Sequence, residues 1–198
     1  IQTAEGGLIE VHDMLQRMRD LALQASNGTY DGDDLSKLND EFEELIDEIH
    51  EVATKRVQFN GKVLLDGTYK YGATDATPIT LQIGPNTDDT LDVYIEDMTA
   101  ITGLDLATME DVTEGEETKK VFTYKVDLKS ITSANAAIDV IDDAIETVSS
   151  NRSKLGAFQN RLDHVINNLG VAAENLSAAN SRIRDVDMAQ EMMSFTRN

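Results

Sequence analysis

The C-terminal third of the chain carries apolar residues spaced alternately three and four positions apart. This row begins near Ser133 and continues towards Asn198 with no proline to interrupt it. An average spacing of 3.5 residues predicts a helix with one apolar face that packs against other helices. Some 60 residues of helix would be roughly 90 Å long, so we expect an elongated molecule. The residues of this row that we expect in the core are Ile145, Leu155, Leu162, Ile166, Leu169 and Leu176.

Two shorter helices are predicted near the beginning of the chain. Residues 1–26 and 33–57 each carry apolar residues at helical spacing, and Asn27-Gly28 separates them. Because the link is short, we expect antiparallel neighbours. Their expected core residues are Leu8, Val11, Leu15, Phe42, Leu45 and Ile49. A long helix does not keep an apolar face in water on its own, so these two helices should cover the C-terminal row.

The middle of the chain has a different pattern. Short strands are predicted at 62–65, 79–83 and 91–96, and the last two flank a Gly84-Pro85-Asn86 loop, which is typical of a β-hairpin. Residues 97–130 are rich in Thr, Asp, Glu and Gly. We expect them to form a variable surface excursion, with a weak strand near 121–126.

These patterns together predict a mainly α fold with a small β subdomain, built as an antiparallel bundle of three long helices plus β-hairpins. The predicted parts are residues 1–58, an N-terminal helical core; residues 59–130, the β-hairpin and variable region; and residues 131–198, the long core helix. Because the last part should pack on the first, the two would form one discontinuous domain.

Composition narrows the classes of partner. The chain has 198 residues, with 17 Lys and Arg against 37 Asp and Glu, and a formal net charge of −20. Such a surface repels phosphate backbones and anionic membranes, so we expect no nucleic-acid or membrane partner. The apolar runs are too short for a transmembrane helix. The chain has no cysteine, which excludes disulfides and thiolate ligands.

No group of residues predicts an enzyme. His12, His50 and His164 lie singly on predicted helices, and none belongs to an HExxH motif. The Asp31–Asp34 cluster lacks the later ligand positions of a calcium loop, and a helix start explains it better. We therefore expect no catalytic residue, no metal, no cofactor and no small-molecule substrate. Because the apolar pattern is already under way at Ile1 and continues near the last residue, we expect a piece of a longer protein.

Several stretches resemble the two ends of bacterial flagellins. Those similar to the N-terminal core are 1–8 (IQTAEGGL), 15–22 (LQRMRDLA) and 58–62 (QFNGK), and those similar to the C-terminal core are 155–161 (LGAFQNR), 166–169 (INNL), 174–179 (ENLSAA) and 181–189 (SRIRDVDMA). The resemblance covers about residues 1–66 and 133–198.

This resemblance implies a structural subunit that is secreted and self-assembles into the extracellular flagellar filament, where it serves motility. The implied partners are other flagellin subunits and the flagellar chaperone and export factors. The outermost terminal segments, which pair as a coiled coil in flagellins, would be absent here. The alternative is a hook-filament junction, filament-cap or adhesin protein that shares the helical core. A metalloprotease inserted in the variable region would need a zinc helix that 97–130 does not contain.

The resemblance also implies recognition by the vertebrate flagellin-sensing Toll-like receptor. The receptor-facing residues of the family match Arg17, Leu21 and Glu41, with Gln16 and Gln24 beside them. Arginine offers planar paired donors, and leucine offers an apolar anchor. Leu21 lies off the predicted buried face, so we expect it to face outward. The alternative interpretation is that Arg17 and Glu41 are ordinary surface charges on helices.

Overall fold

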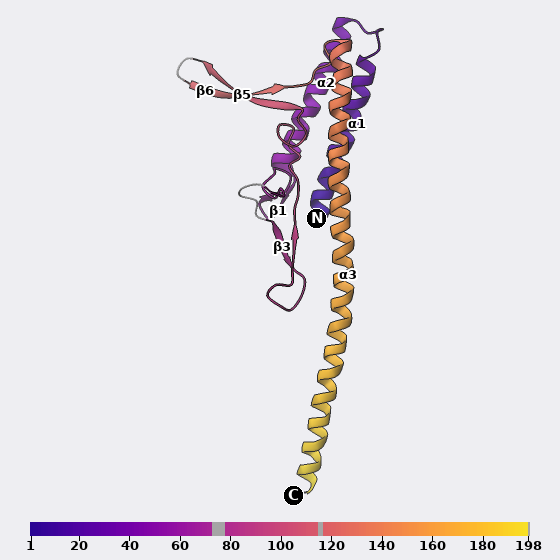
Figure 1. Cartoon of the computed structure of the whole chain (residues 1–198), viewed down its shortest axis with the longest axis vertical. Coiled ribbons are helices and arrows are strands. Elements are labelled where there is room, and N and C mark those ends of the chain that lie inside the picture. Colours follow the sequence, from indigo (N-terminus) through magenta and orange to yellow (C-terminus); the bar gives the residue numbers. More distant parts are fainter. Residues whose placement is uncertain (73–77, 115–116, 198) are drawn as a thin grey trace. The chain divides into compact units, whose positions relative to one another are not determined.

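The structure, a computed structural model, describes residues 1–72, 78–114 and 117–197. Its helices are α1 (Gln2–Ala25), α2 (Gly32–Glu51), the short π-helix η1 (Val52–Arg56) that continues α2, and α3 (Ile131–Arg197) (Figure 1). The fold is mostly helical with small antiparallel β-hairpins, which confirms the predicted fold class. The unbroken α3 is the helix that the apolar row after Ser133 predicts.

The strands among the described residues pair in two-stranded sheets. These are β1 (Gln58–Phe59) with β2 (Lys62–Val63), β3 (Ile79–Gln82) with β4 (Thr90–Val93), and β5 (Ala107–Glu114) with β6 (Glu117–Tyr124). The pairing of β3 with β4 agrees with the predicted hairpin. The strand expected near 121–126 within the surface excursion corresponds to β6, whereas its partner β5 was not predicted. Its sequence does not alternate between apolar and polar residues, and that alternation is the signal that marks a half-buried strand.

Two compact units make up the chain. Unit 1 comprises residues 1–81 and 92–156, and unit 2 comprises residues 82–91 and 157–198. Unit 1 therefore contains α1, α2, η1, the β1–β2 and β5–β6 hairpins and the first part of α3. The division at residues 58 and 130 that the sequence suggests stays a prediction.

Inside unit 1, α1 and α2 pack through one apolar face each. The fully buried side chains on these two helices include Leu8, Val11, Leu15, Met18, Phe42, Ile46 and Ile49. On α2, Ile46 is buried and Leu45 is only half-buried, so the predicted core position of Leu45 is wrong. The reason is the helical period. Phe42, Ile46 and Ile49 follow one another at spacings of four and three, which leaves Leu45 at the edge of the face.

The part of α3 in unit 1 buries alanines as well as larger apolar residues. Its buried apolar side chains are Ala134, Ala137, Ile141, Ala144, Val148 and Leu155. Ile145 is half-buried, so its predicted core position is wrong as well. The apolar pattern gave weight to large residues, whereas alanine permits the close approach that dense interior packing requires.

The part of α3 in unit 2 presents its apolar residues to solvent. Leu176 is 71% exposed and Leu169 is 40% exposed, and Ile166 is also exposed. Leu162 is half-buried. The prediction that these four residues are core residues is therefore wrong for the chain on its own. The spacing of apolar residues identifies the apolar face of a helix, but it carries no information on whether a partner covers that face.

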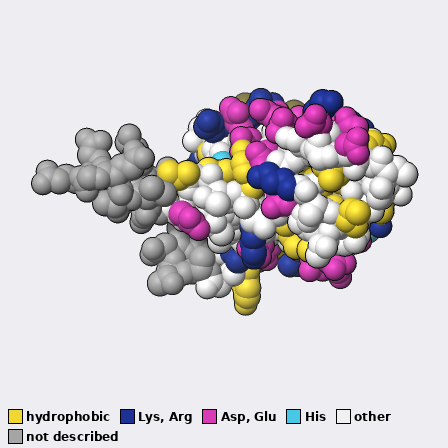
Figure 2. Space-filling view, turned by 90° about the horizontal axis from the view of Figure 1, so that it is seen from above, with side chains coloured by type: hydrophobic (Ala, Val, Ile, Leu, Met, Phe, Trp, Pro, Cys, Tyr) yellow, Lys and Arg dark blue, Asp and Glu magenta, His cyan; other side chains and the backbone are white. Residues whose placement is uncertain are grey.

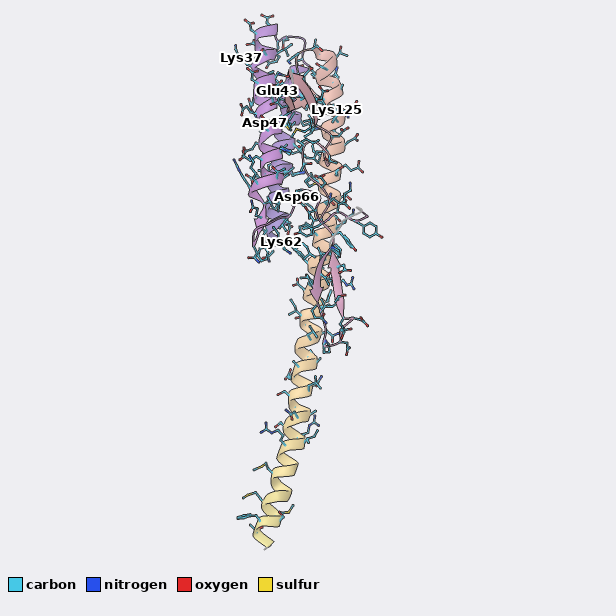
Figure 3. All side chains as sticks on the ribbon, turned by 90° about the vertical axis from the view of Figure 1, so that its left-hand side faces the viewer. Lys37, Glu43, Asp47, Lys62, Asp66 and Lys125 are labelled. Atoms are coloured by element: carbon cyan, nitrogen blue, oxygen red, sulfur yellow. The ribbon has the colours of Figure 1, made fainter. Side chains whose placement is uncertain are left out.

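A buried asparagine connects α2 with the segment before α3. The Leu128 N–H donates to Asn39 Oδ1 at 2.9 Å, and Asn39 Nδ2 donates to Glu43 Oε1 at 2.6 Å. Asn39 is almost fully buried, so both ends of its amide must be paired. Figure 3 labels Glu43 on α2, close to the end of unit 1 that holds the β5–β6 hairpin.

The base of the β5–β6 hairpin is attached to α2 by two contacts. Tyr124 Oη donates to Asp47 Oδ2 at 3.0 Å, and the rings of Phe122 and His50 lie 5.3 Å apart. Burial, together with the hydrogen bond to Asp47, raises the pKa of Tyr124 to about 12. Burial lowers the pKa of His50 below its usual value, which favours the neutral ring against Phe122. The hairpin is thus fixed at its base.

The chain that follows η1 approaches α1 closely at Gly7. A Cβ atom on Gly7 would overlap Val57 Cγ2, whereas a Cβ on the neighbouring Gly6 would meet nothing within 4 Å. Val57 follows η1 directly, so this contact sets the position of the chain that leads into the β1–β2 hairpin.

We expect Gly7→Ala to lower the free energy of unfolding by about 1–3 kcal/mol, because the added methyl overpacks the contact with Val57. The matched control, Gly6→Ala, should raise it by about 0.5–1 kcal/mol, because alanine favours the helix and has open space there. Urea unfolding followed by circular dichroism gives both values. Equal stability of the two variants would contradict the close contact.

Candidate functional site

The predicted receptor-facing residues lie on α1 and α2, which are neighbours in unit 1. We define the α1–α2 surface as Gln16, Arg17, Gln24 and Glu41. Arg17 donates from Nε and Nη2 to Glu41 Oε1, at 2.8 and 2.5 Å, and this ion pair joins the two helices. The two side chains are 55% and 45% exposed. An exposed pair of this kind contributes at most about 1 kcal/mol to stability. Its arrangement presents a guanidinium and a carboxylate to solvent at a fixed relative position.

The two glutamines of the surface differ in their surroundings. Gln16 is exposed, whereas Gln24 is half-buried and donates from Nε2 to Tyr30 Oη at 2.8 Å. Tyr30 lies in the link between α1 and α2, so this bond spans the turn. Tyr30 could not be predicted from residue spacing, because residues in a short link follow neither helical nor strand periodicity.

Leu21 does not face outward. It is 1% exposed, so the expectation that it forms an external apolar anchor is wrong. The buried face of α1 is wider than a single row, and Leu21 lies within it beside Met18 and Ala22. The exposed aliphatic residues of α1 are Ile9 and Leu23, the latter 42% exposed. Each lies seven residues, about two helical turns, from Gln16, and this spacing could have identified both as exposed residues on the same face as Gln16.

Other charged side chains hold the helices of unit 1 together. Arg19 Nε donates to Asp142 Oδ1 on α3 at 2.6 Å, and this hydrogen bond raises the pKa of Arg19. Lys37 on α2 pairs locally with Asp34 at 3.1 Å. Figure 2 shows Asp and Glu side chains interspersed with Lys and Arg over one face of the molecule. The acidic residues that outnumber Lys and Arg therefore lie on the solvated surface, and some of them form ion pairs.

Unit 1 also contains a polar cavity of about 500 Å³ beside α3. Its lining includes Asp97, Asn151 and the ion pair between Lys154 and Glu96, whose Nζ and Oε1 atoms are 3.4 Å apart. Asp97 Oδ1 accepts bonds from the backbone N–H and the hydroxyl of Thr99, so this carboxylate is used within its own turn. Across residues 1–72, 78–114 and 117–197, no three His, Asp or Glu side chains are grouped so that they could hold a metal ion.

The C-terminal part of α3 carries the other candidate surface. We define the α3 row as Ile166, Leu169, Leu176 and Ile183, all of them exposed. Met188, Met192 and Phe195 further along the helix are exposed as well. An exposed series of large apolar residues is typical of a surface that another protein segment covers. Of the helices described, none is long and apolar enough to cross a membrane.

These features define a mainly helical protein with an exposed apolar row on its long C-terminal helix. Models of the bacterial flagellin N-terminal and C-terminal helical regions match residues 1–70 and 138–198. The chain is 48% identical to a flagellin of Bacillus subtilis (strain 168), and all of it aligns with 68% of that protein. It is 46% identical to a flagellin of Halalkalibacterium halodurans, of which it spans 64%. The crystal structure of Bacillus cereus flagellin is similar at a TM-score of 0.65 and 32% identity, covering 84% of this chain and 82% of that one.

The chain therefore belongs to the bacterial flagellin family. Flagellins are structural proteins of the extracellular flagellar filament, so the predictions of a structural role, of no enzymatic activity and of an extracellular location are confirmed at the level of the family. The alternative of a junction, cap or adhesin protein is not supported, because both ends of the chain match flagellin models.

Leu21→Ala should lower the free energy of unfolding by about 2–5 kcal/mol, the usual cost of emptying a buried leucine site. Leu23→Ala, on the same helix but exposed, should change it by less than about 0.5 kcal/mol. Thermal unfolding of the two variants measures the difference. If Leu21→Ala has the same melting temperature as the unsubstituted chain, Leu21 is not a core residue.

Proposed function

We propose that the full-length protein polymerises through the α3 row, which becomes buried between helices of neighbouring subunits or of its own longer termini. The support for this is the exposure of four large aliphatic residues at helical spacing on a chain that belongs to the flagellin family. Burying each of them would contribute about 1.5–3 kcal/mol. A few such residues repeated along a helix are enough to favour assembly.

The distribution of charge supports the same surface. Residues 157–198 carry four arginines and five acidic residues, so this segment is almost neutral. The formal net charge of the whole chain is −20, and most of it therefore lies in the residues before Ala157. Contacts made along the C-terminal part of α3 meet little like-charge repulsion, whereas contacts between the acidic faces of α1 and α2 meet more.

In the full-length protein, Ile183→Asp should prevent filament formation, because it places a carboxylate in the apolar contact. It should leave the melting temperature of the subunit nearly unchanged, because Ile183 is exposed. The matched control is Ala178→Asp, an exposed position on the opposite face of α3, roughly one and a half turns earlier. Electron microscopy under polymerising conditions gives the readout. Filaments from Ile183→Asp, or their equal loss in Ala178→Asp, would rule out the α3 row as the contact.

A second role rests on the α1–α2 surface, which we propose as the site that the vertebrate flagellin-sensing Toll-like receptor contacts. The argument is that Arg17 and Glu41 come from different helices and still present one exposed, oriented charge pair. Arginine in such a position offers further N–H donors to a partner. Leu21 would contribute by holding α1 in place and not by direct contact. The chaperone and export partners implied by the family stay predictions.

Arg17→Ala should weaken binding to the receptor ectodomain at least about tenfold, equivalent to roughly 1.4 kcal/mol. The melting temperature should change little, because the pair with Glu41 is exposed. Lys37→Ala on α2 is the control, since it also removes one exposed positive charge. Surface plasmon resonance with the two variants measures the effect. Equal weakening by both would indicate a general charge effect and contradict a specific site.

A further inference from the structure

The chain contains two Asn-Gly dipeptides, Asn27-Gly28 and Asn60-Gly61. The sequence makes them equal candidates for spontaneous deamidation, since glycine leaves the next backbone nitrogen unhindered. In this reaction that nitrogen loses its proton and attacks the Cγ atom of the asparagine. The bond from Cγ to the side-chain nitrogen breaks, and ammonia leaves with the proton. Water then opens the five-membered imide at either carbonyl, which gives aspartate or isoaspartate.

The structure places Asn27-Gly28 in the link between α1 and α2, and both residues are exposed. The Asn27 N–H donates to Gln24 O at 3.2 Å. Within the described part of the chain, no hydrogen bond restrains the Gly28 N–H or the Asn27 carboxamide. Both residues are therefore open to water, and no strand pairing fixes the backbone between them.

Asn60-Gly61 is exposed as well, but its backbone is held in a hairpin turn. Asn60 has φ 52° and Gly61 has φ 75°, and the pairs Phe59–Lys62 and Gln58–Val63 of β1 and β2 close the turn. This is the left-handed geometry of a two-residue hairpin loop. With ψ near about +47° in this region, the nitrogen of the next residue points away from Cβ, so it cannot reach Cγ unless the hairpin opens.

We propose that Asn27 is a site of spontaneous deamidation in the folded protein and that Asn60 is protected by its turn. The modification adds a negative charge just after α1, where the helix dipole is already negative and the last turn has no basic residue. It also falls beside the bond between Gln24 and Tyr30 that spans the link. The inference stands on the two backbone environments and does not depend on the proposed function.

The test is to keep the whole chain in mildly alkaline buffer and to map its peptides by mass spectrometry, which detects the replacement of the amide by a carboxyl group. Asn27 should react at least about tenfold faster than Asn60, a ratio equivalent to a barrier difference of about 1.4 kcal/mol. In concentrated denaturant the two rates should become similar, because the fold no longer distinguishes the sites. Equal rates in the folded chain, or a ratio that persists in denaturant, would overturn the proposal.

Gly28→Ala provides the matched variant. Gly28 does not have a left-handed φ, and an added Cβ would meet only Ile131 Cδ1, at an ordinary 3.8 Å, so the fold should be kept. The methyl group hinders the attacking nitrogen, so reaction at Asn27 should slow strongly while Asn60 is unaffected. An unchanged rate at Asn27 would show that its loss of ammonia does not proceed through the Gly28 nitrogen.

Discussion

Small residues at buried positions are the constraint on which unit 1 depends. Ala134, Ala137 and Ala144 are buried on α3, and Gly7 allows Val57, just after η1, to approach α1. A densely packed interior leaves no room for an added methyl group, so these positions require small residues. The larger apolar residues, such as Phe42 and Leu15, then fill the space that remains.

Helical periodicity was sufficient to locate the helices and most of the buried face of α1. It failed where size and periodicity disagree. Ile145 is only half-buried while its neighbour Ala144 is buried, and Leu45 is only half-buried while Ile46 is buried. It failed again for Leu21, because a helix covered by neighbours on two sides buries a wider face than one row of residues. Strand β5 and its pairing with β6 were not predicted, because apolar and polar residues do not alternate along the whole strand.

The candidate site was predictable only in part. The resemblance to flagellins identified Arg17 and Glu41, and the structure brings these two residues from different helices into one ion pair. Neither the burial of Leu21 nor the hydrogen bond from Gln24 to Tyr30 could be derived from spacing, since both depend on how α1 and α2 meet. For the α3 row the limit is of another kind. A sequence reports that a face is apolar, but the partner that covers it belongs to a different segment or a different molecule.

The β5–β6 hairpin leaves and re-enters the core at one point. Ala107 and Tyr124 are paired in register, and the Lys125 N–H donates to Leu106 O directly below them. Because the entering and leaving strands are neighbours, the distance that the core must span is the same whatever lies beyond them. An insert of any length whose own ends are close together could occupy this place while Phe122 and Tyr124 keep their contacts with α2. The hairpin is thus a suitable insertion site for foreign loops or whole domains.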